Sequence, residues 1–352
     1  MNRQTARLRW SWRHALFLLG VLFLAAFPWI SESRSMLILL TQVFILAVYA
    51  MSYDILLGYT GIVSFGHAMF FGIGAYTVGI LLKRVDDTLT VILMAVVVAI
   101  VLAAAVSFII GALSLRLKSH YYAMLSLAFA GLFLVVAEKW RSLTMGNDGF
   151  TFTIPELLRD REMFYYISLL FMLVMYGLLR RFIQSPMGKV LEAIRENEQR
   201  AESLGYKTLH YKIIASIVAG VAAALSGIMY ALALRFVNTS VFAVETTLDA
   251  LLMTIVGGVG TLFGGIVGAF LIEFAHHWLT NLAKVHWIFE RWIIFFGIVY
   301  VLIVLFFPRG IVGTVQQWLA ARSHKRRPSG GEKTGAAQEL NRQPQLSHKP
   351  KL

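Results

Sequence analysis

Residues 89–113 read LTVILMAVVVAIVLAAAVSFIIGAL, twenty-five consecutive positions without a charged side chain. At a rise of about 1.5 Å per residue, a helix of this length is long enough to cross the ~30 Å hydrocarbon core of a bilayer. Of the 352 residues, 58% are hydrophobic and 14% are charged, whereas a soluble domain carries about 25% charged residues. These features exclude a soluble enzyme and predict an all-α, polytopic transmembrane helical bundle.

Apolar runs of similar character lie on both sides of this stretch. They occupy residues 14–30, 36–57, 62–82, 121–137, 163–179, 213–234, 247–278 and 287–307. The run 247–278 is too long for one straight helix, and the sequence GGVG at 257–260 interrupts it. We therefore predict about ten spans, or nine if this run is unbroken.

The distribution of Lys and Arg predicts the orientation of the bundle. With ten alternating crossings and a cytoplasmic N-terminus, 22 of the 32 Lys and Arg residues lie inside and 10 outside. We expect a basic cytoplasmic N-terminus (1–13), a permease domain (14–307) and a basic, largely disordered cytoplasmic tail (308–352). The first run also resembles a signal peptide, but no small-x-small cleavage site follows it, so we expect an uncleaved helix. The net charge of +13 favours contact with anionic lipids rather than nucleic acid.

Two glycine-rich stretches, 58–76 and 257–269, interrupt the apolar pattern with residues that weaken helices. Irregular backbone at membrane depth occurs only where protein or a water-filled cavity covers it, and in transporters such broken helices line the path. We predict a substrate pathway formed by Thr60, Ser64, Phe65, Gly66, His67, Gly72, Gly74, Gly257, Gly258 and Gly260. The alternative is tight helix packing, for which Gly260, Gly264 and Gly268 have the right spacing.

Few ionisable residues lie within or near the apolar runs, and each is costly in lipid. They are Asp54, Asp249, Glu273, His276 and His277. Asp54 and Glu273 are the better interior candidates, and a proton-coupled carrier would use such groups as relays.

Catalytic patterns are weak throughout the sequence. The chain has no cysteine, which excludes disulfides and thiolate sites. A serine hydrolase using Ser64 and His67 lacks the glycine that a nucleophile elbow needs at Ile62. Residues 273–277 (EFAHH) do not form the zinc-binding motif HExxH. We predict no catalytic residue, no metal and no cofactor.

The loop 180–212 is the most informative cytoplasmic segment. Residues 187–206 predict one short amphipathic helix that begins after Ser185 and ends at Gly205. Its mixed charge argues against a helix that lies on the lipid surface. The alternatives are packing under the bundle and, more specifically, docking into a groove of a cytoplasmic partner. The expected contact residues are Glu192, Ala193, Ala201, Glu202, Leu204 and Gly205.

The motifs together resemble the permease subunits of branched-chain amino-acid ABC importers, the LivM-like permeases. The resemblance covers roughly residues 35–315. Its pieces are LGYTG (57–61), SFGH (64–67), FFGIGAY (70–76), GNDG (146–149), MGK (187–189), AESLG (201–205) and GGVGTLFG (257–264).

This resemblance implies an alternating-access permease in the bacterial inner membrane that has no ATPase activity of its own. The implied partners are a sister permease, two cytoplasmic ATPase subunits and an extracytoplasmic substrate-binding protein. The helix within 180–212 would be the coupling helix that receives the ATPase movement. Family members also carry urea, short amides or other amino acids, so the substrate stays open among these.

Overall fold

The structure, a computed structural model, describes residues 19–29, 33–115, 119–283, 297, 301, 305 and 310–314. The chain divides into two units, Met1–Gly313 and Thr314–Leu352, and the elements below belong to the first. The predicted N-terminal segment 1–13, most of the run 287–307 and, apart from 310–314, the tail 308–352 lie outside the described residues. Of the run 14–30, the structure describes the apolar helix Leu19–Trp29.

Six helices in the described part of the chain are long and apolar enough to cross a membrane. They are α2 (Arg34–Asp54) with its continuation to Thr60, α4 (Leu89–Ser114), α5 (Ser119–Lys139), α8 (Arg161–Gln184), α11 (Thr208–Leu234) and α13 (Leu262–Ala283). The prediction of an all-α polytopic bundle is confirmed.

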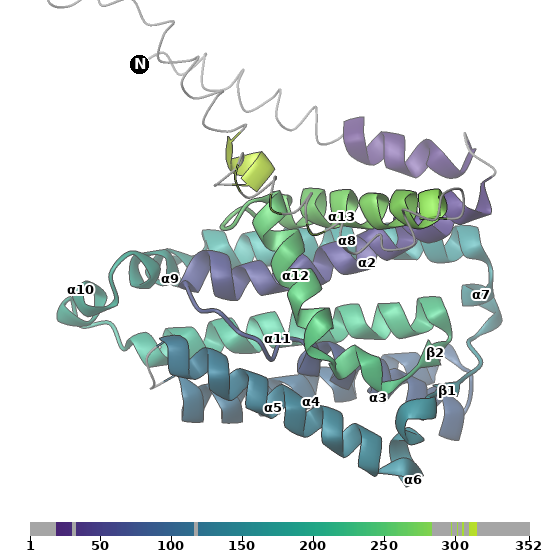
Figure 1. The fold of residues 1–352 in the computed structure, drawn as a ribbon, viewed down its shortest axis with the longest axis horizontal. Helices are drawn as coiled ribbons and strands as arrows, with labels where there is room; N and C mark the ends of the chain where they lie inside the picture. Colours follow the sequence, from purple (N-terminus) through teal and green to yellow (C-terminus); the bar gives the residue numbers. More distant parts are fainter. Residues whose placement is uncertain are drawn as a thin grey trace, which may run out of the picture. The chain divides into compact units, whose positions relative to one another are not determined.

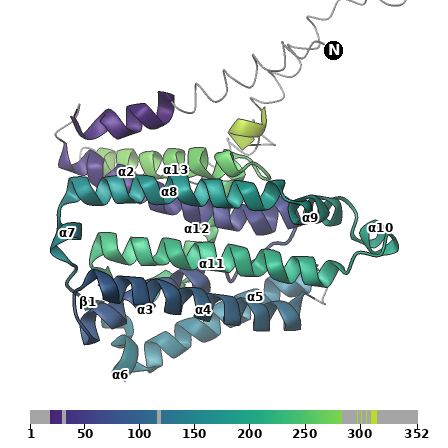
Figure 2. The same ribbon diagram turned by 180° about the vertical axis from the view of Figure 1, so that it is seen from behind.

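Helix α11 lies at the centre of this bundle and packs against α2, α4 and α3 (Ala68–Arg84) (Figures 1 and 2). Its buried face is rich in small residues, among them Ala215, Ala219, Ala223 and Ala231. Helix α2 in turn packs against α8 and α13. Small side chains allow the helix backbones to approach closely, which is the main source of helix association in lipid.

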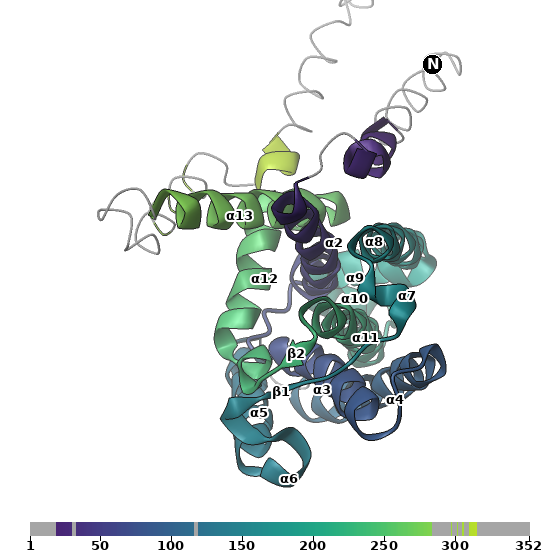
Figure 3. The same cartoon turned by 90° about the vertical axis from the view of Figure 1, so that its right-hand side faces the viewer.

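Both glycine-rich stretches break the helices that contain them. Helix α2 continues as a π-helix, Ile55–Thr60, which ends at Gly61 with φ +72°. Helix α3 begins only at Ala68, so the first residues of the apolar run 62–82 belong to the irregular segment and not to the helix. The run 247–278 is split, as predicted, into α12 (Val244–Gly257) and α13, with positive φ at Gly258 and Gly260. Figure 3 shows α12 steeply inclined to α13 on one side of the bundle.

A small cap covers the end of the bundle that we predict to be outside. It contains α6 (Arg141–Thr144), the 3₁₀ helix Gly146–Asp148, α7 (Glu156–Arg159) and the 3₁₀ helix Thr239–Phe242. Strands β1 (Phe150–Thr151) and β2 (Phe236–Val237) pair antiparallel, with Phe150 opposite Val237.

The opposite end carries the segment expected to be one helix over 187–206. The structure has two helices there, α9 (Pro186–Glu196) and α10 (Glu198–Ser203), and corrects that expectation. The break lies at Asn197, whose extended backbone and side-chain cap on Arg200 N (2.9 Å) start a new helix.

Candidate functional site

His67 lies fully buried among aromatic rings. Its Nε2 is 2.8 Å from the hydroxyl of Ser52. Tyr49 stacks on the imidazole at a centroid distance of 5.4 Å, and Tyr53 meets it edge-on at 5.3 Å. The hydrogen-bond partner of His67 is thus Ser52 rather than Ser64, so the two residues of the hydrolase alternative are not arranged as nucleophile and base.

The irregular segment before α3 is held by side chains of other helices. Tyr53 donates a hydrogen bond to the carbonyl of Ser64 (3.0 Å), and the N–H of Phe65 donates to Oγ of Ser126 (3.0 Å). A methyl group on Gly66 would overlap the carbonyl of Ser126. These bonds satisfy backbone groups that the missing helical turn leaves free.

Two further glycines of the predicted pathway lie in helix contacts. A methyl group on Gly74 would overlap the carbonyl of Ala224 on α11, and one on Gly227 of α11 would overlap the carbonyl of Phe71. Gly72 instead lies against the side-chain ring of Phe242. The structure therefore places Gly74 where two helix backbones meet and Gly72 beneath an aromatic ring, and their role in the pathway remains a prediction.

The second glycine stretch meets the first at one buried point. The N–H of Gly260 donates to Oδ1 of Asp54 at 2.7 Å, and the guanidinium of Arg195 donates to the carbonyl of Gly58. Asp54 is fully buried. We call these four residues the glycine junction. It joins the end of α2, the break between α12 and α13, and α9.

The glycines explain how the residues of the glycine junction can come into contact. A side chain at Gly58 would overlap both Asp54 and the backbone of Gly260. Gly260 has φ +79°, a conformation that other residues adopt only with strain. Gly257 packs against Gly264 and Gly268 against Met253, so the predicted glycine packing of α12 on α13 is present.

Helices α9 and α10, which we call the coupling segment, are tied to their neighbours at both ends. The hydroxyl of Ser185 caps α9 by accepting from Gly188 N (3.4 Å). At the far end, Glu198 pairs with Lys212 of α11. The hydroxyl of Thr208 donates to Oε1 of Glu202 at 2.8 Å.

The predicted contact residues of the coupling segment differ in exposure. Leu204 is 72% exposed and Ala193 is exposed, whereas Ala201 is only 3% exposed and belongs to the chain's own core. Glu192 forms a surface ion pair with Lys189 at 2.8 Å. Gly205 ends the segment with φ +90°. Leu204 is therefore the most exposed of the large apolar side chains in this segment.

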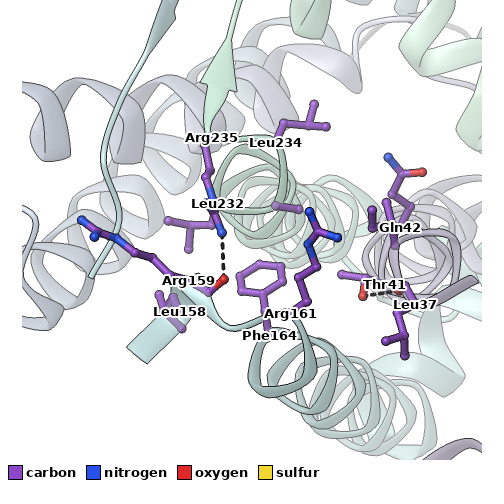
Figure 4. A pocket seen from close by; sticks show the side chains of 12 residues that line it. Leu37, Thr41, Gln42, Leu158, Arg159, Arg161, Phe164, Leu232, Leu234 and Arg235 are labelled. Carbon is purple, nitrogen blue, oxygen red and sulfur yellow. Dashed lines mark hydrogen bonds between the residues drawn. The ribbon is translucent and has the colours of Figure 1, made fainter. Parts of the chain in front are cut away.

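A cavity of about 420 Å³ opens beside the cap and is lined by three arginines (Figure 4). Arg235 donates to the carbonyl of Arg159 at 3.0 Å, and Arg159 lies 3.6 Å from Asp87. Arg161 points into the same space beside Phe164. This outer cavity suits an anionic group.

Sequence reasoning missed Arg195 and the outer arginines. Arg195 lies on the polar face of α9, where a charged residue is ordinary, and no periodicity indicates that it reaches the π-helix. Asp54, by contrast, was identified as an interior candidate because its charge interrupts an apolar run. No group of three His, Asp or Glu residues in the described part of the chain is arranged to hold a metal.

Comparison with known proteins gives one family. Residues 35–307 match the family described as branched-chain amino acid transport system, permease component. No solved structure matches the chain.

Individual relatives agree with this match. The chain is 25% identical to the high-affinity branched-chain amino acid transport system permease protein LivM of Escherichia coli, over 85% of this chain and 75% of that protein. It is 25% identical to the probable LivM of Methanocaldococcus jannaschii, over 63% of this chain and 74% of that protein. A shorter region, 34% of this chain, is 32% identical to 38% of the autoinducer 2 import permease LsrC of Photorhabdus laumondii.

Proposed function

Because the chain belongs to the family of permease components of branched-chain amino-acid transport systems, we propose that it carries branched-chain amino acids inward as one membrane subunit of an ATP-driven importer. Urea and short amides are the alternative substrates. The protein is integral to the membrane. The bacterial inner membrane is its expected location, with both termini in the cytoplasm.

The complex would contain a sister permease, two ATPase subunits and an extracytoplasmic binding protein. The exposed Leu204 supports docking of an ATPase subunit on the coupling segment. The arginines of the outer cavity support contact with acidic groups of a binding protein at the other end. ATP hydrolysis then takes place on separate subunits.

The observation that carries the mechanism is the contact between α9 and the two helix breaks. Arg195 holds the carbonyl of Gly58, and Asp54 holds Gly260, so movement of the coupling segment reaches both breaks directly. Closure of the ATPases would shift α9 and, through the glycine junction, the angle between α12 and α13. The path would then open on the opposite side.

Arg195→Ala tests this mechanism in the complex that co-purifies with the tagged chain from its own host. We expect ATP hydrolysis to continue in proteoliposomes while uptake of leucine, isoleucine and valine per ATP falls about tenfold, the effect of losing one charge-assisted hydrogen bond. Arg181→Ala, at an exposed arginine near the same end of the bundle, is the matched control. Normal coupling in Arg195→Ala would contradict the mechanism.

The same proteoliposomes test the wider proposal. Uptake of labelled urea without uptake of leucine would show that urea is the substrate and branched-chain amino acids are not. Uptake driven by a pH gradient without ATP would favour the proton-coupled carrier.

A further inference from the structure

A second cavity, of about 620 Å³, lies between α2, α3, α11, α12 and α13. Apolar side chains form much of its wall, among them Leu46, Phe71, Leu252 and Ile272. Three carboxylates line it, Glu245 and Asp249 from α12 and Glu273 from α13, and His276 of α13 lies in the same wall. We call it the carboxylate cavity.

The formal charge of the carboxylate cavity is negative. None of the described residues that line the carboxylate cavity is Lys or Arg. Asp249 is exposed in the isolated chain, and Glu273 is half-buried near the middle of α13. A carboxylate at membrane depth does not face hydrocarbon without cost. The open side of this cavity therefore meets protein or water rather than lipid.

A further polar group reaches the same cavity. Tyr49 lines it and is 1% exposed. The hydroxyl of Thr247 lies beside that of Tyr49 and accepts a hydrogen bond from the N–H of Ala68 at 2.9 Å. Tyr49 therefore adds a hydroxyl group to a wall that is otherwise largely apolar and acidic.

The carboxylate cavity and the outer cavity have one lining residue of α2 in common. Gln42 lines both of them. Toward the cap, the outer cavity is lined by Leu37 and Thr41, and in the other direction the carboxylate cavity is lined by Leu46 and Tyr49. The carboxylate cavity also reaches the cap, because Ser240 and Val241 of the 3₁₀ helix Thr239–Phe242 line it.

Resting on the proposed function, we propose that the carboxylate cavity binds the amino-acid substrate in transit. Asp249 and Glu273 pair with its ammonium group, and Leu46, Leu252 and Ile272 contact its branched side chain. Ionised carboxylates are strong partners for an ammonium group inside a protein. The apolar wall favours a branched hydrocarbon side chain over a polar one of the same size. The substrate's carboxylate then points toward Gln42.

The first test replaces each of these two carboxylates with its amide, which has nearly the same shape. In the complete complex in proteoliposomes, Asp249→Asn and Glu273→Gln are expected to lower leucine uptake about tenfold or more. ATP hydrolysis stimulated by the binding protein should stay near the wild-type rate, because neither residue touches the coupling segment. Asp249→Glu should restore part of the uptake. The control is Glu156→Gln, at an exposed acid on α7.

The second test does not depend on the folding of the amide variants. The chain has no cysteine, so Leu252→Cys introduces a single thiol into this subunit of the assembled complex, and labelling is read on the band of this subunit. We expect a water-soluble maleimide to modify it, and leucine with its binding protein to slow that modification.

The outcomes separate the two proposals. Wild-type leucine uptake together with full uptake in both amide variants overturns the carboxylate cavity and leaves the importer intact. A Leu252→Cys thiol that stays closed to the maleimide in every state of the ATPase cycle also overturns the cavity. A wild-type complex that transports no branched-chain amino acid overturns the proposed function, and this inference with it.

Discussion

Asp54 accepts a hydrogen bond from the backbone N–H of Gly260, a residue 206 positions further along the chain, at 2.7 Å. This bond joins the end of α2 to the turn between α12 and α13. Because the same turn lies against Arg195 of α9, the bond also connects the membrane helices with the coupling segment.

Removing the Asp54 side chain should destabilise the protein. Asp54→Ala leaves the half-buried N–H of Gly260 without its hydrogen-bond partner, at a cost of about 1–3 kcal/mol. Asp54→Asn keeps an acceptor oxygen and should cost less. Thermal unfolding of the purified complex in detergent measures both. Equal melting temperatures for Asp54→Ala and wild type would show that the bond contributes nothing.

The packing of α3 on α11 should not tolerate a side chain at Gly74. Gly74→Val pushes a branched side chain into the carbonyl of Ala224, and overpacking of this kind costs about 1–3 kcal/mol or more. The expected result is loss of folded protein from the membrane fraction. Gly177→Val is the control, because nothing lies within 4 Å of a methyl group there. Equal amounts of both variants would contradict the contact.

Gly66→Leu should behave like Gly74→Val. From the sequence we expect Gly66→Leu or Ser64→Leu to abolish uptake while the subunit still folds. The carbonyl of Ser126 beside Gly66 changes the expectation for that residue, since leucine would disturb the helix contact itself. The amount of assembled complex, measured beside uptake, distinguishes the two outcomes: normal assembly without uptake would support the pathway prediction.

Aspartate introduced at Leu204 and at Ala201 of the coupling segment should have two different effects. Leu204→Asp changes an exposed side chain, so the permease should stay stable while ATPase subunits dissociate or hydrolyse ATP without transport. Ala201→Asp puts a charge into the chain's own core and should destabilise the permease, because an unpaired buried charge is strongly unfavourable. Co-purification of ATPase subunits and thermal unfolding measure the two effects. Full ATPase binding and coupling in Leu204→Asp would rule out docking at this residue.

The predicted topology places the loop with Arg141 and the tail with Arg322 on opposite sides of the membrane. Lys and Arg accumulate on the side that faces the cytoplasm, and the loops predicted to be inside carry most of them. Reporter fusions after Arg141 and after Arg322 should therefore give opposite signals. The same signal from both would overturn the predicted topology.

The helices and their breaks could be predicted from the sequence, because the length of an apolar run and the position of a glycine affect the structure locally. The interruption at Gly257–Gly260 is an example, since glycine at positive φ ends α12 whatever surrounds it. Residues 187–206 show the limit: their apolar spacing suits one helix, but the cap at Asn197 divides it. A local hydrogen bond there outweighs the periodicity.

The contacts between distant parts of the chain could not be predicted from the sequence in the same way. The partners Asp54 and Gly260, and likewise Arg195 and Gly58, lie far apart in sequence. Only the packing of whole helices brings them together. The same holds for Asp249 and Glu273, which the sequence identifies as costly in lipid but does not place in one cavity.

Gly74 and Gly227 each admit the backbone of the opposite helix, so α3 and α11 touch main chain to main chain at two levels. Such a contact leaves no side chain between the helices that can change rotamer and let them slide. We therefore expect the amides of this pair to be among the last in the protein to exchange with deuterium, since the most tightly packed elements open least often. During the transport cycle α3 and α11 would stay fixed relative to each other, while α12 and α13 change their angle beside them.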